Sequence, residues 1–247
     1  MRYYQKHHQY YAGIDLHARK MYICIIDSQG NILLHRNYDS SPDNLISAIG
    51  PYLQDIVIGV ECVFTWYWIA DFCEDHNIPF ILGHALYMKA IHGGKTKNDK
   101  IDSSKIASLI RGDLFPIAYV YPRKMRATRD LLRRRQYFTH KQSELLGHIK
   151  NTASQYNLPA FQKSIQYGSN RTFIPEHFQS QDPSVQLSIQ TDLETLDFYH
   201  QELNKIELQI KRHAVHHDPY SYHLLKTVPG IGPILGLVYH ILDNFFL

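Results

Sequence analysis

Residues 10–16 read YYAGIDL, an apolar stretch that ends beside Asp15. Two similar stretches follow closely, residues 21–27 (MYICIID) and residues 32–38 (ILLHRNY), and the link DSQG at 27–30 is rich in turn-forming residues. Short strand-like stretches joined by such links are typical of tight hairpins. The sequence therefore predicts an antiparallel meander of three strands over these residues.

Beyond the meander, helical and strand-like patterns alternate. Pro42 is typical of a helix start, and the apolar run IVIGV before Glu61 is typical of a buried strand. We expect a helix at 42–53, a strand at 56–61, a helix at 66–76, a strand at 79–82 and a helix around Asp99. This order, β-β-β-α-β-α-β-α, specifies an α/β fold with a mixed sheet covered by helices, which is the ribonuclease-H-like order. Asp15 and Glu61 then lie on neighbouring strands.

Four carboxylates stand at the ends of these elements: Asp15, Glu61, Asp99 and Asp102. Asp99 and Asp102 are three residues apart, so a helix places them on one face. Each aspartate alone can be explained as a cap or turn residue, whereas a buried Glu61 needs a cation or a hydrogen-bond donor. Four convergent carboxylates repel one another unless cations lie between them. We therefore predict a catalytic metal site for magnesium, or alternatively manganese, that serves two-metal phosphodiester chemistry.

Other metal sites and membrane association receive little support from the sequence. The three cysteines, Cys24, Cys62 and Cys73, lack paired spacing and fall in apolar segments, which is typical of buried thiols. The histidine pairs at 7–8 and 216–217 lack further partners at ligand spacing. Because neither a long apolar run nor a signal-peptide pattern occurs, we expect a cytoplasmic protein with no membrane partner.

Segment 123–150 is strongly basic, with nine Lys or Arg residues against two acidic residues, whereas the whole chain carries only +3. A basic segment on an otherwise acidic body predicts a polyanion partner that docks there, and a solvated helix face is the alternative. The nucleic-acid-binding residues that we predict are Lys95, Lys97, Lys100, Arg123, Lys124, Arg126, Arg129, Arg133, Arg134, Arg135, Gly230 and Gly232.

Past Pro122 the pattern becomes helical, and we expect a hairpin of two long helices at 123–157 and 184–214. The apolar residues of the second helix recur in steps of three and four, which predicts a coiled-coil seam. These residues are Ile189, Leu193, Leu196, Leu203 and Ile210. The seam can pair with a second copy of the chain in a homo-oligomer, or it can pack between the two arms of one chain.

Residues 224–233 (LLKTVPGIGP) predict a helix, a tight turn and a new helix near Pro233. Gly230 and Gly232 permit a helix-hairpin-helix turn whose backbone amides can hold a phosphate, and a plain connection between helices is the alternative. The expected segments are a flexible tail (1–9), a ribonuclease-H-like domain (10–120), a helical hairpin (121–218) and the start of a further domain (219–247).

Four motifs together resemble one protein family. They are GIDLH at 13–17, VE at 60–61 before an aromatic-rich helix, KTKNDKIDSSKIA at 95–107, and TVPGIGP at 227–233. Over nearly its whole length the chain resembles the DEDD insertion-sequence transposases, or recombinases, which are related to Piv-type DNA invertases. The resemblance implies a RuvC-like domain and a coiled coil that dimerises, and it implies DNA transposition guided by a structured bridge RNA. It assigns the magnesium-binding catalytic tetrad to Asp15, Glu61, Asp99 and Asp102.

One departure from the family bears on activity. Its members continue past the Pro-Gly-Ile-Gly motif into a domain with a serine nucleophile, whereas this sequence ends at Leu247, so we expect a C-terminally shortened member. A RuvC-like structure-specific endonuclease that uses a metal-activated water and a catalytically silent nucleic-acid-binding regulator are the alternatives. The sugar-kinase and actin class is disfavoured, because residues 17–19 lack the glycine and hydroxyl group of its phosphate loop.

Overall fold

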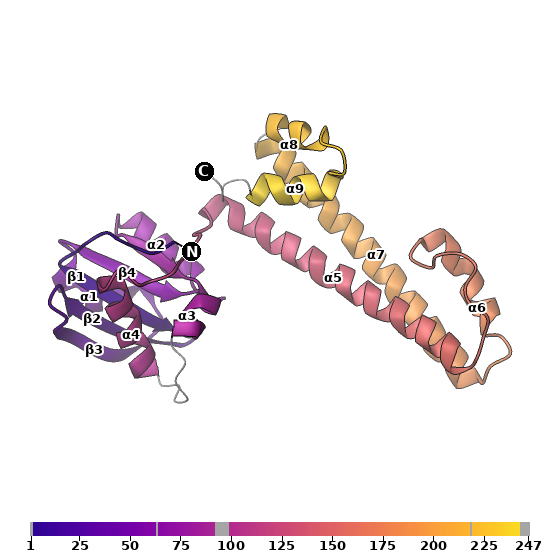
Figure 1. The fold of residues 1–247 in the computed structure, drawn as a ribbon, viewed down its shortest axis with the longest axis horizontal. Helices are drawn as coiled ribbons and strands as arrows, with labels where there is room; N and C mark the ends of the chain where they lie inside the picture. Colours follow the sequence, from indigo (N-terminus) through magenta and orange to yellow (C-terminus); the bar gives the residue numbers. More distant parts are fainter. Residues whose placement is uncertain (1, 63, 92–98, 218, 243–247) are drawn as a thin grey trace. The chain divides into compact units, whose positions relative to one another are not determined.

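The computed structural model describes residues 2–62, 64–91, 99–217 and 219–242 (Figure 1). The chain divides into two compact units, unit 1 with residues 1–123 and unit 2 with residues 124–247. Unit 1 contains a mixed sheet with its helices, and unit 2 is helical. The predicted fold class, a mixed α/β sheet flanked by helices and followed by a helical region, is confirmed.

The sheet of unit 1 has six strands in the order β3-β2-β1-β4-β5-β6. β1 (Tyr10–Leu16) pairs antiparallel with β2 (Lys20–Asp27), and β2 pairs antiparallel with β3 (Ile32–Asp39), as the predicted meander requires. β4 (Ile56–Glu61) joins β1 in parallel, and β5 (Phe80–Gly83) joins β4 in parallel. Asp15 and Glu61 are therefore on neighbouring strands, as expected.

A short strand, β6 (Ile117–Ala118), adds an unpredicted antiparallel edge beside β5. Residues 2–9, expected as a flexible tail, are bonded to unit 1. The backbone N–H of the first residue of β6 donates to Arg2 O at 3.0 Å, and His8 Nδ1 lies 2.6 Å from Asp55 Oδ1. The N-terminal segment thus extends the sheet unit instead of standing apart from it.

One face of the sheet is covered by α4 (Asp99–Arg111). Two strand glycines let this helix approach closely: a Cβ on Gly13 would lie 2.2 Å from Ser103 O, and one on Gly59 would lie 2.4 Å from Ile110 Cδ1. Gly13 and Gly59 are direct partners in the β1–β4 pair, so together they form a flat floor under the helix. The buried core on this face comprises Tyr11, Cys24, Ile26, Val57, Ile81, Met88, Ile106, Ala107, Ile110 and Phe115.

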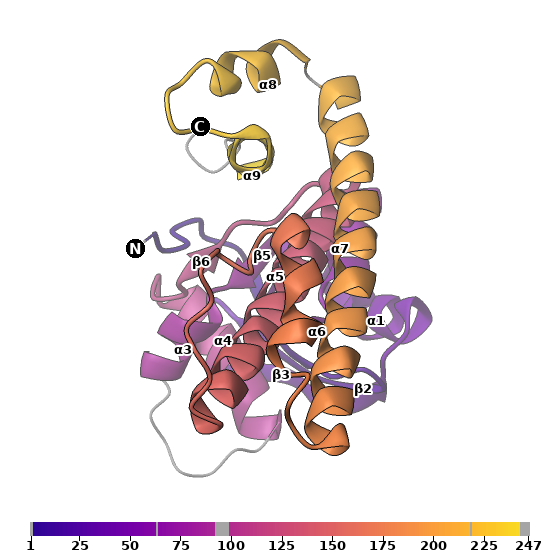
Figure 2. The ribbon, with the colours of Figure 1, turned by 90° about the vertical axis from the view of Figure 1, so that its right-hand side faces the viewer.

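The opposite face is covered by α1 (Pro42–Ile49) and α2 (Tyr67–Asp75). The connections β3–α1–β4 and β4–α2–β5 both cross between parallel strands in the same direction, and right-handed crossovers then place both helices on one face. Figure 2 shows α1 and α4 on opposite sides of the strands. Buried residues on this side include Ala12, Ile14, Leu45, Ile49, Ile58, Ile69 and Cys73.

Two helical details differ from the expectation. The helix expected over 42–53 ends at Ile49 and continues as a 3-10 turn, η1 (Gly50–Tyr52). The reason is Pro51, which has no N–H for an α-helical hydrogen bond. Helix α3 (Ala85–Ile91) was not predicted.

Unit 2 is built on α5 (Arg123–Gln155) and α7 (Pro183–His217), close to the two expected helices. All five predicted seam residues of α7 are at most 8% exposed. They pack within the chain, because Leu196 shares a buried cluster with Ile149 and Ile210 shares another with Met125. The seam is therefore an intrachain contact and does not itself require a second copy.

Shorter helices complete unit 2. η2 (Gly168–Phe173) leads into α6 (Ile174–His177), whose Ile174 belongs to the buried cluster at the loop end of the hairpin. α8 (Pro219–Lys226) and α9 (Pro233–Leu242) flank the predicted tight turn, in which Gly230 has a φ of +87° that favours glycine. None of the helices described in the structure is both long and apolar enough to cross a membrane.

Candidate metal centre

Asp15 lies near the end of β1, and 17% of its side chain is exposed. Side chains alternate along a strand, so Asp15 points to the same face as Gly13, which is the face that α4 covers. Burial raises the pKa of the Asp15 carboxyl; the His17 imidazole lowers it, and the charges of Asp99 and Asp102 raise it. The sequence has therefore placed a partly buried carboxylate close to two others, where a cation is favoured.

His17 follows Asp15 in the turn between β1 and β2, and two hydrogen bonds fix its backbone. Its N–H donates to Lys20 O at 2.8 Å, and its carbonyl accepts from Ser40 Oγ at 2.9 Å. The imidazole Nε2 lies 3.5 Å from Asp15 Oδ2 and 3.5 Å from Asp99 Oδ1. The sequence did not predict this contact, because a histidine two residues after an aspartate is an ordinary turn residue.

Asp99 and Asp102 both lie in the first turn of α4. The N-terminal end of a helix favours negative charge, because its backbone N–H groups point outward there. His35 on β3 holds this turn against the sheet, since its Nε2 lies 2.8 Å from Lys100 O. Asp102 also forms an ion pair with Lys105 at 3.8 Å. Strand β1 thus positions Asp15, and helix α4 positions Asp99 and Asp102.

Asp15, His17 and Asp99 bring three ligand atoms within 4.8 Å of one another. Asp102 lies outside this group, although its charge is close enough to raise the pKa of Asp15. The structure therefore brings together two of the four predicted ligands, sets a third nearby, and adds a histidine that was not predicted.

Glu61 ends β4 and is half-buried. Ile14 of β1 pairs with Val60 of β4, and Asp15 and Glu61 are the next residues on these two parallel strands. The backbones of neighbouring strands lie about 4.8 Å apart. The carboxylate of Glu61 is not part of the three-residue group. The predicted location of Glu61 on the sheet is confirmed, and its role as a metal ligand stays a prediction.

Comparison with known protein families identifies the family of this chain. The family of IS110-type DEDD proteins, described as transposase, matches residues 12–158, which is more than half of the chain. The chain belongs to this transposase family. No curated protein matches it. The matched residues contain all four predicted carboxylates and continue through α5.

Membership of the DEDD transposases indicates the use of a divalent metal, and the donor atoms of this transposase fit such an ion. Carboxylate oxygens are ligands for magnesium and manganese, and imidazole nitrogen is a ligand for transition metals. Asp15 and Asp99 could offer the oxygens, and His17 could offer the nitrogen. Burial is the main cause of the raised pKa of Asp15, and the charges of Asp99 and Asp102 add to it, so a cation bound here would relieve both.

The predicted nucleic-acid-binding residues of this transposase fall into groups. Lys95 and Lys97 lie outside the described residues. Those with exposed side chains in the structure are Lys100, Arg123, Lys124, Arg133 and Arg134. Gly230 and Gly232 are also exposed, in the turn between α8 and α9, and their phosphate role stays a prediction.

Three of the predicted arginines are engaged in contacts of their own. Arg123 lies 3.4 Å from Asp71 and 3.3 Å from Asp75. Arg135 Nε donates to Glu207 Oε1 at 2.7 Å and joins α5 to α7. Arg129 lies 3.5 Å from Asp130.

Arg126 is a correction to the prediction. Only 5% of this residue is exposed, so it is wrong as a surface contact for phosphate. A count of charges along a helix takes no account of which face is buried, and Arg126 lies beside the buried Met125 on α5.

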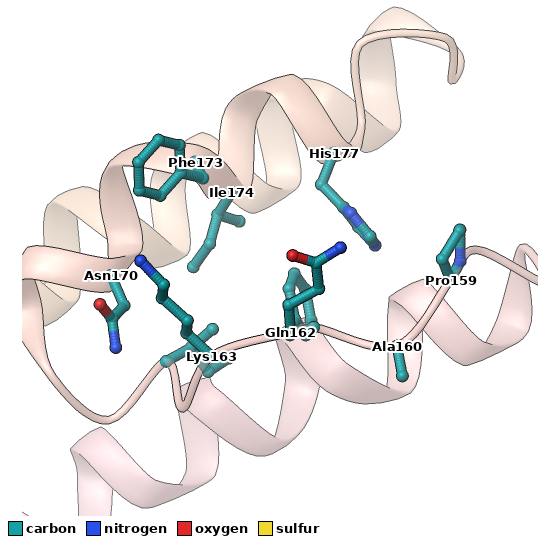
Figure 3. A pocket seen from close by; sticks show the side chains of 10 residues that line it. Pro159, Ala160, Gln162, Lys163, Asn170, Phe173, Ile174 and His177 are labelled. Atoms are coloured by element: carbon teal, nitrogen blue, oxygen red, sulfur yellow. The ribbon is translucent and has the colours of Figure 1, made fainter.

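Unit 2 also contains a cavity of about 470 Å³ between residues 159–165 and the η2–α6 segment (Figure 3). Figure 3 shows Gln162 and His177 pointing toward one another across it. None of the ten described residues that line it carries a carboxylate or a thiol. This cavity is therefore not a second centre of the kind found in unit 1.

Proposed function

We propose that this chain is a transposase subunit whose unit 1 carries out divalent-metal-dependent chemistry on DNA phosphodiester bonds. The observation that supports the proposal best is the convergence of Asp15 and Asp99, which are far apart in the sequence, on one imidazole. Membership of the DEDD transposase family adds the substrate class, because transposases act on DNA.

In this proposal, Asp15, Glu61, Asp99 and Asp102 hold magnesium or manganese. Such ions, when bound, stabilise the negative charge on the attacking and leaving oxygens of a phosphodiester. The residues of the chain provide the positioning. Asp15 is fixed by the register of β1, and Asp99 is fixed by α4, whose first turn His35 ties to the sheet. Glu61 stands on the adjacent strand, from which it completes the set.

The DNA partner is proposed to dock on the exposed cations of α5. The side chains of Lys124, Arg133 and Arg134 are exposed. The negative charges of a phosphate backbone attract such positively charged groups. Arg134 also lies 4.5 Å from the centre of the Phe138 ring, which holds its guanidinium in place. The family resemblance extends the proposal to a structured guide RNA and to a homo-oligomer.

Cleavage assays test the proposed function. The purified chain is incubated with branched and linear DNA, with magnesium or EDTA, and with and without co-purifying RNA. We expect strand cleavage that requires the metal and that Asp99→Asn abolishes, while Asp43→Asn, an exposed carboxylate on α1, leaves it unchanged. Equal cleavage by Asp99→Asn would contradict the metal role. Metal-independent binding without cleavage would favour the silent regulator instead.

Salt-dependent binding tests the proposed DNA surface. The logarithm of DNA affinity falls with the logarithm of salt concentration, and removing one phosphate contact makes this fall less steep by roughly 0.9. We expect Arg133→Ala and Arg134→Ala each to weaken DNA binding and to reduce this slope by about one. Lys163→Gln is the matched control, because Lys163 is an exposed cation of unit 2 that is not among the predicted DNA contacts. An unchanged slope in both alanine variants would show that the DNA docks elsewhere.

A further inference from the structure

We propose that His17 is a direct ligand of the metal ion in unit 1, and that its nitrogen makes the site bind manganese in preference to magnesium. This inference rests on the proposed function, because it concerns the same ion that Asp15 and Asp99 are proposed to hold. It adds a residue outside the four carboxylates and names the metal that the donor atoms favour.

The distances around His17 are close to those between ligands of one ion. Two ligand atoms bound at about 2.1 Å to one ion stand roughly 3.0–3.4 Å apart. Nε2 of His17 lies 3.5 Å from one oxygen of Asp15 and 3.5 Å from one oxygen of Asp99. The imidazole is equally far from both carboxylates, and a shift of a few tenths of an ångström would bring all three groups to the spacing of ligands that share an ion.

The local structure holds the backbone of His17 beside the site. The backbone of His17 is fixed by its hydrogen bonds to Lys20 and Ser40. The side chain is 55% exposed, so an incoming ion can reach Nε2. Asp15 is much less exposed, at 17% of its side chain. A fixed turn with an accessible nitrogen beside a partly buried carboxylate is a preorganised ligand pair.

The nitrogen decides the preference between the two metals. Magnesium prefers oxygen ligands in near-ideal octahedral geometry and keeps several waters. Imidazole is a ligand of first-row transition metals, and affinity along that row is lowest for manganese and rises after it. Manganese, as the first of these ions, accepts a nitrogen ligand more readily than magnesium, which keeps to oxygen. One imidazole added to carboxylates thus shifts the site toward manganese. Without His17 the remaining ligands are oxygens, and the preference should weaken.

Electron paramagnetic resonance of bound Mn²⁺ tests the inference on the full chain. A directly bound imidazole gives ¹⁴N modulation of the Mn²⁺ signal, which we expect in the wild type and expect to vanish in His17→Ala. Mn²⁺ affinity should fall tenfold or more, and the ratio of Mg²⁺ to Mn²⁺ dissociation constants should fall with it. His140→Ala, an exposed histidine on α5, is the control and should keep the modulation. Circular dichroism checks that both variants fold.

The outcomes separate this inference from the proposed function. In one outcome, Mn²⁺ binds the wild type without ¹⁴N modulation and Asp15→Asn loses the ion. This result would overturn the role of His17 and leave the carboxylate site standing. Mn²⁺ that binds equally to wild type and Asp15→Asn would overturn the proposed site, and the role of His17 with it. Modulation that persists in His17→Ala would assign the nitrogen to another histidine and overturn the inference.

Discussion

Asp15→Asn should abolish divalent-metal binding by unit 1 and, in EDTA, raise its melting temperature. Burial, and then the charges of Asp99 and Asp102, raise the pKa of Asp15 in the folded state. A raised pKa gives stability that is present below the unfolded-state value and is lost as the pH rises through the folded-state value. At neutral pH the ionised carboxyl therefore destabilises the metal-free fold. A neutral amide removes that cost and also removes the charged ligand.

Calorimetry in EDTA and in Mn²⁺, between acidic and neutral pH, measures both effects. The wild type should gain stability with metal by mass action, and Asp15→Asn should not. In EDTA the melting temperatures of the two proteins should converge toward acidic pH, where Asp15 is protonated. A variant that melts lower than the wild type in EDTA and still responds to metal would show that Asp15 is a structural residue.

Asp27→Asn is a control with the opposite sign. Asp27 lies in the β2–β3 turn, where the side chain of Asn31 donates to it at 2.9 Å and lowers its pKa. A lowered pKa gives stability that is present above the unfolded-state value and is lost as the pH falls through the folded-state value. Asp27→Asn should therefore lower the melting temperature at neutral pH and leave metal binding unchanged.

The sheet could be predicted because its signals are local. The apolar, strand-like stretches within residues 10–38 and the DSQG link specify the meander without reference to the rest of the chain. The chain order of strands and helices then limits the topology, which sets Asp15 beside Glu61. The three-residue spacing of Asp99 and Asp102 likewise predicted two carboxylates in one helical turn. Pro51 is also a local signal, and the helix expected over 42–53 has the wrong end because that expectation took no account of this proline.

The contacts of the candidate site could not be read in the same way. His35 reaches Lys100, 65 residues further along, only because α4 packs across the meander. His17 meets Asp99 for the same reason. The burial of Arg126 depends on which face of α5 packs, and a charge count does not contain that information. One signal was present: a glycine inside a buried strand, such as Gly13, marks the close approach of another backbone.

Gly13→Ala should destabilise unit 1 by about 3 kcal/mol or more, because overpacking a well-packed core costs roughly 1–3 kcal/mol and more when backbone must move. The new Cβ would lie 2.2 Å from Ser103 O and 2.4 Å from Ala107 N, which are backbone atoms of α4. No change of side-chain rotamer can relieve these contacts, so the helix itself must shift. Since that helix carries Asp99 and Asp102, metal binding should weaken together with stability.

Gly59→Ala is the matched control on the adjacent strand. Its Cβ would lie 2.4 Å from Ile110 Cδ1, the end of a flexible side chain that can turn away. We expect a cost of about 1 kcal/mol and metal affinity close to the wild type. Urea unfolding of both variants, with Mn²⁺ titration of each folded protein, measures the difference. Equal losses in the two variants would contradict the argument, because a close backbone contact of α4 exists at Gly13 and not at Gly59.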